Sequence, residues 1–91
     1  MKKIKLFSIK NFKVGQDVSG FYLCKDKYIK KTRLGDSYID LILQDSTGKI
    51  RAKIWNHAKH FSNNFIKNDI VAVKGSIIGF NNENELNIKS I

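Results

Sequence analysis

Cysteine is almost missing from this 91-residue chain, and long apolar stretches are missing altogether. The single cysteine, Cys24, has no partner for an intramolecular disulfide and no second thiolate for a zinc knuckle. No apolar run approaches the roughly 20 residues needed to cross a bilayer. The basic segment at residues 1–5 is not followed by a continuous hydrophobic segment with a cleavage site. We therefore expect a cytoplasmic protein with no membrane partner.

Acidic residues are also scarce, because eight Asp and Glu stand against 17 Lys and Arg, which gives a formal net charge of +9. The imbalance is uneven: residues 1–33 contain ten of the basic residues and only two acids, Asp17 and Asp26. A basic surface on a small domain is typical of polyanion binding. The alternative is a compositional bias toward Lys, Asn and Ile, which would leave only a solvated basic face.

Residues that could bind a metal are too few for a site. His57 and His60 lie three residues apart, and zinc sites usually have three or four ligands. No Cys, Asp or third His has a spacing that matches this pair. We therefore expect no metal and no cofactor.

The acids do not form a catalytic pair either. Asp45 belongs to a predicted turn, and Asp40 is expected to form an ion pair across a hairpin, with Arg51 or Lys53. The only two glutamates, at positions 83 and 85, are predicted to lie in a distant turn. The sequence therefore predicts a domain without a catalytic site.

What the chain has in quantity is β-forming sequence, most clearly over residues 37–56. Two runs rich in β-branched and aromatic residues flank Asp45-Ser46-Thr47-Gly48, which predicts a β-hairpin with a short loop. Side chains in a strand point alternately to its two faces. The inward residues of this hairpin are then Ile39, Leu41, Leu43, Ile50, Ala52 and Ile54. The outward residues are Tyr38, Asp40, Ile42, Gln44, Arg51, Lys53 and Trp55.

The segment before the hairpin contains one further predicted strand. A chain of 91 residues makes one small domain, and residues 1–16 form a basic lead-in that either caps it or hangs loose. A strand is predicted over residues 18–24, and because both of its faces carry apolar residues, both should be covered. Residues 25–36 are predicted to form a polar loop.

The segment after the hairpin contains a helix and two strands. A short helix is predicted over residues 57–65, with Asn56 as its N-cap, and it should close one end of the fold. The last two strands are predicted over residues 69–80 and 85–91, with a turn between them.

This order of β-β-β-α-β-β, with glycines inside the first and fourth strands, resembles the OB-fold, a five-stranded Greek-key barrel of the all-β class. The segments that carry a closer resemblance, over residues 9–91, are Val14-Gly15-Gln16, Gly20-Phe21-Tyr22-Leu23, Tyr38-Ile39-Asp40-Leu41, Leu43-Gln44-Asp45-Ser46-Thr47-Gly48, Ala52-Lys53-Ile54-Trp55 and Asp69-Ile70-Val71 with Gly75. This resemblance is to the N-terminal nucleic-acid-binding OB domain of YhaM-type exoribonucleases. It implies a single OB-fold domain over residues 1–91, which binds RNA beside a separate metal-dependent catalytic domain of the HD type. This chain contains no His-Asp dyad.

The candidate nucleic-acid site combines the basic loop with the outward face of the hairpin. Lys53 and Trp55 are two residues apart, so one strand of nucleic acid could place a phosphate at the ammonium and a base on the indole. Trp55 could instead close the barrel beside the helix, and the loop lysines could be merely solvated. Phe80, beside the turn after the fourth strand, could stack on a base but is expected to end the core. The predicted site residues are Phe21, Lys30, Lys31, Arg33, Tyr38, Gln44, Arg51, Lys53 and Trp55.

We therefore expect a non-catalytic domain that binds single-stranded RNA or DNA, with RNA favoured by the resemblance alone. The basic first third would supply salt-dependent affinity and the hairpin would supply stacking. The alternative is a protein-interaction or oligomerisation module that uses the outward apolar residues Phe21, Leu23 and Ile42. Its partner would be a catalytic domain or a second copy of the chain. A nuclease acting on this barrel is the third hypothesis.

Overall fold

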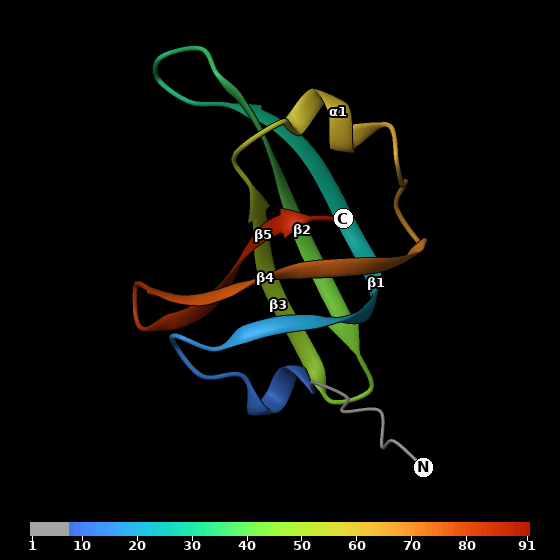
Figure 1. The fold of residues 1–91 in the computed structure, drawn as a ribbon, viewed down its shortest axis with the longest axis vertical. Coiled ribbons are helices and arrows are strands. Elements are labelled where there is room, and N and C mark those ends of the chain that lie inside the picture. The colour runs from blue at the N-terminus through green and yellow to red at the C-terminus, as the bar shows by residue number, and fades with distance from the viewer. Residues whose placement is uncertain (1–7) are drawn as a thin grey trace.

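The computed structural model describes residues 8–91, in which five strands form one closed barrel in the order β1-β2-β3-β5-β4 (Figure 1). The elements are η1 (Ile9–Asn11), β1 (Asp17–Lys31), β2 (Ser37–Asp45), β3 (Gly48–Ile54), α1 (Ala58–Ser62), β4 (Ile70–Phe80) and β5 (Glu83–Ser90). The predicted class of a five-stranded all-β barrel with one short helix between the third and fourth strands is confirmed. Neither helix within residues 8–91 is long and apolar enough to span a membrane.

The antiparallel pair β2–β3 forms the wall of the barrel that the sequence predicts best. Ile39 is opposite Ile54 at one end of the hairpin, and Asp45 is opposite Gly48 at the other. All six residues predicted to point inward are buried, because alternate side chains of both strands face the barrel interior. The core sits between this hairpin and the buried residues of β4 and β5, which are Val71, Val73, Ile77, Leu86 and Ile88.

Strand β1 is longer than the sequence predicts. The predicted strand ends at Cys24 and a polar loop follows over residues 25–36, whereas β1 continues through Lys31 and pairs with β2 along this length. Its first half pairs with β4, and a bulge between Cys24 and Asp26 lies where it leaves one partner for the other. Residues 25–31 are rich in lysine, so the sequence pattern does not indicate a strand there. Backbone pairing with β2 does not require apolar side chains on both faces. The loop between β1 and β2 is only residues 32–36.

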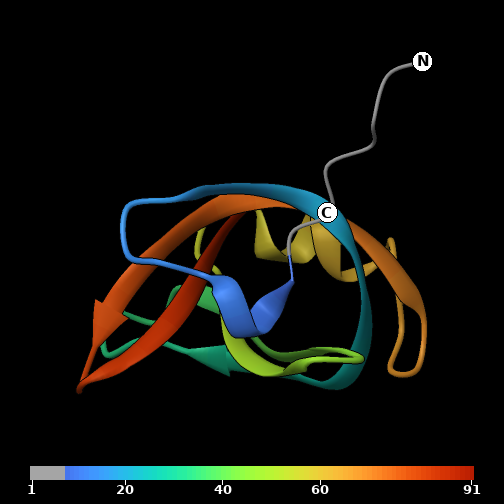
Figure 2. The same cartoon turned by 90° about the horizontal axis from the view of Figure 1, so that it is seen from below.

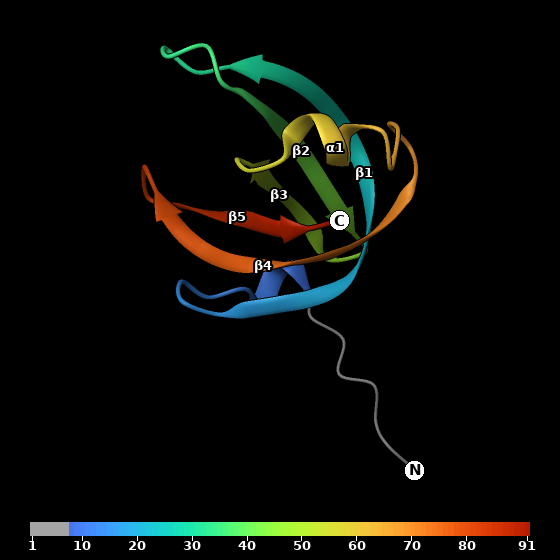
Figure 3. The ribbon, with the colours of Figure 1, turned by 45° about the horizontal axis from the view of Figure 1, so that its top comes forward.

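The β4–β5 hairpin depends on glycine at one position and on positive φ at its turn. A Cβ atom at Gly75 would lie 2.3 Å from the backbone oxygen of Asn87 on β5, so this close approach requires glycine. Asn81 and Asn82 have φ of 50° and 64°, as in the type I′ turns that suit two-residue hairpin loops. Figures 1 and 3 show this turn and the β1–β2 loop projecting on the same side of the barrel.

Helix α1 lies at one end of the barrel, as predicted, but it is shorter than the predicted helix over residues 57–65. It spans Ala58–Ser62, and its N-cap is His57 rather than Asn56. His57 has a left-handed backbone, with φ of 59°, so the chain turns one residue later than the sequence pattern indicates.

Lys27 of β1 holds the end of this helix. Its Nζ donates to the carbonyl oxygens of Ser62 at 2.6 Å and Phe65 at 2.7 Å, and lies 4.3 Å from the centroid of the Phe65 ring. The bond to Ser62 satisfies a carbonyl that the last turn of the helix leaves without a partner in the helix, and the bond to Phe65 holds the segment that follows. Ordinary spacing patterns do not reveal this contact between residues far apart in the chain.

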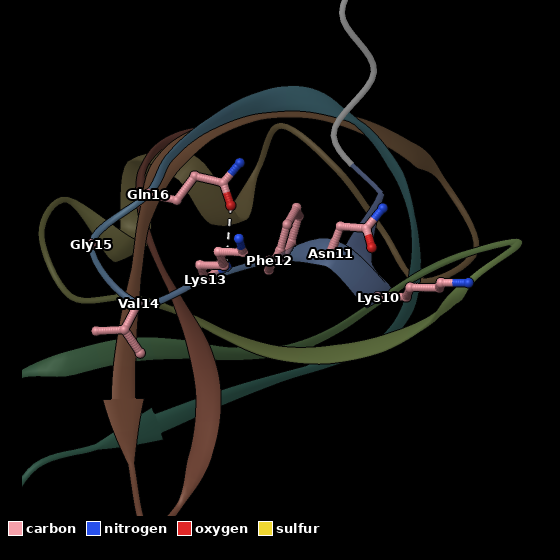
Figure 4. Close-up of a pocket in the computed structure, with 7 residues that line it drawn as sticks. All are labelled: Lys10, Asn11, Phe12, Lys13, Val14, Gly15 and Gln16. Carbon is pink, nitrogen blue, oxygen red and sulfur yellow. Dashed lines mark hydrogen bonds between the residues drawn. The ribbon is translucent and has the colours of Figure 1, made fainter.

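The described part of the lead-in, residues 8–16, covers the opposite end of the barrel, where Figure 2 shows η1 lying across the opening. Asp45 Oδ2, in the β2–β3 hairpin, accepts a hydrogen bond of 2.9 Å from the backbone amide of Ile9. Phe12 is buried and packs edge-on against Tyr22, with ring centroids 6.0 Å apart. Figure 4 shows its ring pointing into the barrel, whereas Lys10 points away. This part of the lead-in is therefore a cap, and residues 1–7 lie outside the described residues.

Candidate nucleic-acid interface

Two stacked aromatic rings lie at the open end of the β2–β3 hairpin. Because Ile39 pairs with Ile54, Tyr38 and Trp55 lie opposite each other one step farther along the two strands. Their ring centroids are 4.6 Å apart and their planes meet at 26°. Tyr38 is half-buried, while Trp55 is 42% exposed. Trp55 therefore lies on the surface and is not part of the buried core.

Lys53 lies between this aromatic pair and a third ring. Its Nζ is 5.4 Å from the centroid of Trp55 and 5.2 Å from the centroid of Phe80 on β4. Glu85 of β5 lies 3.3 Å from the same ammonium, and the Lys53 and Glu85 side chains are only 15% and 6% exposed. A cation within about 6 Å of a ring centroid is attracted by the ring quadrupole. The carboxylate thus fixes an ammonium between two exposed aromatic side chains.

Phe80 is a residue of this face that the sequence prediction assigns to the core, and that prediction is wrong. Phe80 is 55% exposed and pairs with Glu83 beside the hairpin turn. The alternation of buried and exposed residues in β4 predicts the exposure of Phe80. Val73 and Ile77 are buried, so even-numbered positions of this strand point outward.

The predicted place of the glutamates in a distant turn is also wrong. Strand β5 begins at Glu83, and its parallel pairing with β3 puts Glu85 opposite Arg51, next to Lys53. Parallel pairing between strands separated by a helix and another strand leaves no local pattern in the sequence. Alternation within the β2–β3 hairpin therefore cannot predict that the Glu85 carboxylate lies beside Lys53.

A second ion pair joins β1 to β2 on the same face. Lys30 Nζ donates to Asp40 Oδ2 at 2.8 Å, and this hydrogen bond together with the charge of Asp40 raises the pKa of Lys30. The predicted pairing of Asp40 with Arg51 or Lys53 is therefore wrong. Lys53 is opposite Asp40 in the register but pairs with Glu85, and the extension of β1 is what brings Lys30 beside Asp40.

The predicted basic loop is divided between a strand and a turn. Lys30 and Lys31 are the last two residues of β1 and pair with Tyr38 and Ser37 of β2. Arg33 is exposed in the loop of residues 32–36, which closes through Gly35 in a left-handed conformation, with φ of 87°. Lys30, Lys31 and Arg33 therefore lie at the end of β1 and in the loop after it, near Tyr38. Lys31 and Arg33 are both exposed.

Two predicted residues lie apart from the aromatic pair. Gln44 is six residues from Tyr38 along β2, a distance of about 20 Å in a strand. Gln44 lines a shallow pocket with Phe21, which lies on the half of β1 that pairs with β4. Phe21 is 74% exposed, so the expectation that both faces of the first strand are covered is wrong. Arg51 is exposed on the outward face of β3, two residues from Lys53.

The structure therefore brings together a subset of the predicted residues and adds others. The predicted residues that gather are Lys30, Tyr38, Lys53 and Trp55, with Lys31, Arg33 and Arg51 around them. The added residues are Phe80, Glu85 and Asp40. Within residues 8–91 no group of three or more His, Cys, Asp and Glu could hold a metal ion.

Three curated relatives are similar to most of the chain. The 3'-5' exoribonuclease YhaM of Oceanobacillus iheyensis is 35% identical over 78 residues, which are 86% of this chain and 25% of the relative. The YhaM proteins of Shouchella clausii and a Geobacillus species are 31% and 32% identical over 83 residues, 91% of this chain and 26% of each relative. The chain thus spans about a quarter of the length of these relatives.

A solved structure and a family model agree on the fold. The second OB-fold domain of replication protein A from Methanococcus maripaludis superposes with a TM-score of 0.71 at 21% sequence identity, over 92% of this chain and 89% of that one. Residues 25–91 match the model of the family described as OB-fold nucleic acid binding domain. A closed barrel in this strand order, a matching family model and exoribonuclease relatives lead to one assignment. The chain belongs to the family of OB-fold nucleic-acid-binding domains.

Proposed function

We propose that this domain binds single-stranded nucleic acid, RNA in preference to DNA, on the face that carries Tyr38, Lys53, Trp55 and Phe80. The observation that carries the proposal is the Lys53 ammonium fixed between the exposed rings of Trp55 and Phe80. Stacking of a base on an aromatic ring contributes about 1–3 kcal/mol and tolerates any base. A strand with one base on each ring would place the intervening phosphate near the ammonium. Such a site would have little sequence preference.

Long-range attraction for the strand would come from cations around this face rather than from its centre. Lys30 and Lys53 are both paired with carboxylates, whereas Lys31, Arg33 and Arg51 are exposed and belong to none of the ion pairs found among residues 8–91. Each phosphate contact releases counterions from the nucleic acid, so affinity should fall as salt rises. Steep salt dependence is therefore part of the proposal.

The preference for RNA and the link to catalysis rest on the relatives. All three are named 3'-5' exoribonucleases, and this chain spans about a quarter of their length. We propose that the domain holds RNA for a separate catalytic domain in the cytoplasm and that it does not itself cleave RNA. Incubation with labelled RNA and added divalent metal tests this separation, and cleavage by the isolated chain would contradict it.

The binding proposal is tested by fluorescence anisotropy with an oligouridylate and an oligothymidylate of equal length at low salt. We expect both to bind, with the oligouridylate tighter. Tighter binding of the oligothymidylate would contradict the preference for RNA, and absence of binding to either would contradict the function itself. A duplex of the same length is the matched control, because its bases cannot stack on the aromatic side chains without opening.

A second candidate function is contact with another protein chain through an apolar patch on β1 and β4. Phe21 and Ile70 are 74% and 67% exposed, and Leu23, which pairs with Ile70, lines the same shallow pocket. Exposed apolar side chains gathered in one place are typical of interaction surfaces. Sedimentation at increasing concentration tests the form in which the partner is a second copy. Self-association that Phe21→Ser removes would support it, and a monomer at every concentration would contradict it.

A further inference from the structure

The two lysines at the centre of the proposed face each have a carboxylate partner. Lys30 Nζ lies 2.8 Å from Asp40 and Lys53 Nζ lies 3.3 Å from Glu85. A paired ammonium attracts a phosphate less strongly than a free one, because the partner carboxylate offsets its charge. The aromatic centre is therefore suited to bases, and much of the attraction for phosphates must come from cations at its margins.

One such margin is a pocket on the side of Trp55 where the β1–β2 loop faces the beginning of α1. One wall is residues 35–37, and the other is residues 55–60, which include His57, Lys59 and His60. Figures 1 and 3 show that the loop and the helix lie at the same end of the barrel. Trp55 lines this pocket and also contacts Lys53, so the pocket is a direct continuation of the proposed face.

The pocket is lined by one lysine and two imidazoles, Lys59, His57 and His60, and none of them belongs to an ion pair within the described part of the chain. Lys59 and His60 are exposed. His60 packs edge-on against Phe61 at 5.3 Å between ring centroids, and His57 does so at 6.5 Å, which holds both imidazoles near the pocket. The acidic residue of the lining is Asp36, on the opposite wall.

His57, which lines the pocket, has an unusual left-handed backbone conformation. It is one of four non-glycine residues within residues 8–91 that have positive φ, and the other three are asparagines. Every residue other than glycine adopts this left-handed conformation at some cost in free energy, although Asn and His adopt it more often than most. Strained residues of this kind gather at binding sites.

We propose that this pocket binds the phosphate that follows the nucleotide stacked on Trp55, through Lys59 and His60. The strand would then run from Phe80 over Lys53 and Trp55 into the pocket. The ligand is an internucleotide phosphate of single-stranded nucleic acid. This inference rests on the proposed function, since it extends the same binding face by one contact. It also gives His60 a role other than metal binding.

The proposal predicts a dependence on strand length. A short oligonucleotide that covers only the aromatic side chains leaves the pocket empty, and one added nucleotide at the correct end fills it. Because the pocket lies on one side of Trp55, lengthening the strand should improve affinity at one end more than at the other. Loss of one phosphate contact should also reduce the slope of log affinity against log salt by about 0.7.

The experiment measures anisotropy of labelled oligouridylates from four to eight nucleotides long, for the wild-type chain and for Lys59→Ala with His60→Ala. We expect the double variant to bind the longest strand about 3- to 10-fold more weakly and the shortest within twofold of wild type, with the change in salt slope confined to long strands. Lys49→Ala, an exposed lysine near the far end of the hairpin, is the charge-matched control and should leave the length dependence unchanged.

Asp36→Asn should increase affinity, a result that partial unfolding of the variant cannot produce. Removing the carboxylate from the opposite wall should raise affinity for long strands about two- to threefold and leave the shortest strand unchanged. The same gain with length in the wild type and the Lys59/His60 variant would overturn the pocket assignment while the aromatic face stands. No binding of any strand by the wild-type chain would overturn the proposed function and the pocket with it.

Discussion

Glu85 of β5 and Lys53 of β3 form an ion pair of 3.3 Å in which the two side chains are only 6% and 15% exposed. The two residues are 32 positions apart in the chain, but their strands are parallel neighbours in the barrel. This pair holds the Lys53 ammonium beside the rings of Trp55 and Phe80. One carboxylate therefore links the closure of the barrel to the geometry of the proposed binding face.

Glu85→Gln should destabilise the domain. The substitution keeps the size of the side chain but removes the charge opposite Lys53, so a nearly buried ammonium loses its partner. We expect the free energy of unfolding to fall by about 1–3 kcal/mol, measured by urea denaturation. Glu83→Gln is the matched control, because Glu83 is exposed on the same strand, and it should change stability by less than about 0.5 kcal/mol. Equal effects of the two substitutions would contradict the role given to Glu85.

Gly75→Ala should be far more damaging than the same change at Gly79. A Cβ atom at position 75 would lie 2.3 Å from the backbone oxygen of Asn87, which cannot move without opening the β4–β5 pair. We expect a loss of about 1–3 kcal/mol in the free energy of unfolding, as in overpacked cores. At Gly79 the nearest atom is Val14 Cγ2 at 3.5 Å, an ordinary contact. If Gly79→Ala were as costly, the close approach at Gly75 would not be the cause.

Asp45 should make stability depend on pH in the acid range. Burial acts to raise the pKa of this carboxyl, but hydrogen bonds from Thr47 and from the amides of Ile9, Thr47 and Gly48 together hold it below its ordinary value of 3.8. The folded state therefore favours the carboxylate. Its contribution to stability is present above the ordinary pKa and is lost as pH falls through the lower folded pKa.

Comparison of wild type with Asp45→Asn by urea denaturation between pH 6 and pH 2 tests this. We expect the variant to be less stable at pH 6, and the difference between the two proteins to shrink below pH 4. Other carboxyls titrate in the same range, so the difference between the proteins is the informative quantity. A difference that stays constant over the whole range would contradict the account of Asp45.

Phe80→Ala should weaken binding of single-stranded RNA without weakening the fold. Phe80 is 55% exposed, so little buried area is lost, while one stacking surface next to Lys53 disappears. We expect a loss of about 1 kcal/mol, roughly fivefold in affinity, by fluorescence anisotropy. Ile66→Ala is the control, because Ile66 is an exposed apolar side chain, at 68%, in the segment between α1 and β4. Comparable losses for both variants would remove Phe80 from the site.

Local patterns in the sequence predict the five strands, apart from the second half of β1, and the inward residues of the hairpin. Alternation predicts the burial of Ile39, Leu41 and Leu43 because side chains in a strand change face at every residue. It also places Tyr38 and Trp55 on one face, where they stack. These predictions hold because each depends only on neighbours within one hairpin.

The ion pairs could not be found in this way, since they depend on contacts between distant segments. Lys30 reaches Asp40 only because β1 continues past its bulge, and Lys53 reaches Glu85 only because β3 and β5 run parallel. Composition made residues 25–31 look like a loop, although backbone pairing with β2 makes them a strand. Alternation within the β2–β3 hairpin thus predicts the face that Tyr38 and Trp55 share, but it predicts neither the exposed ring of Phe80 nor the partners of Lys30 and Lys53.

The most direct test of the central claim compares wild type and Trp55→Ala in binding labelled single-stranded RNA at low salt. Trp55 is 42% exposed, so its removal should leave the barrel folded, which circular dichroism and urea denaturation would check. We expect the wild-type chain to bind, and the variant to bind at least about fivefold more weakly, as the loss of one stacked base requires. Equal affinity of the two proteins, or no binding by the wild-type chain, would contradict the claim that this face binds nucleic acid.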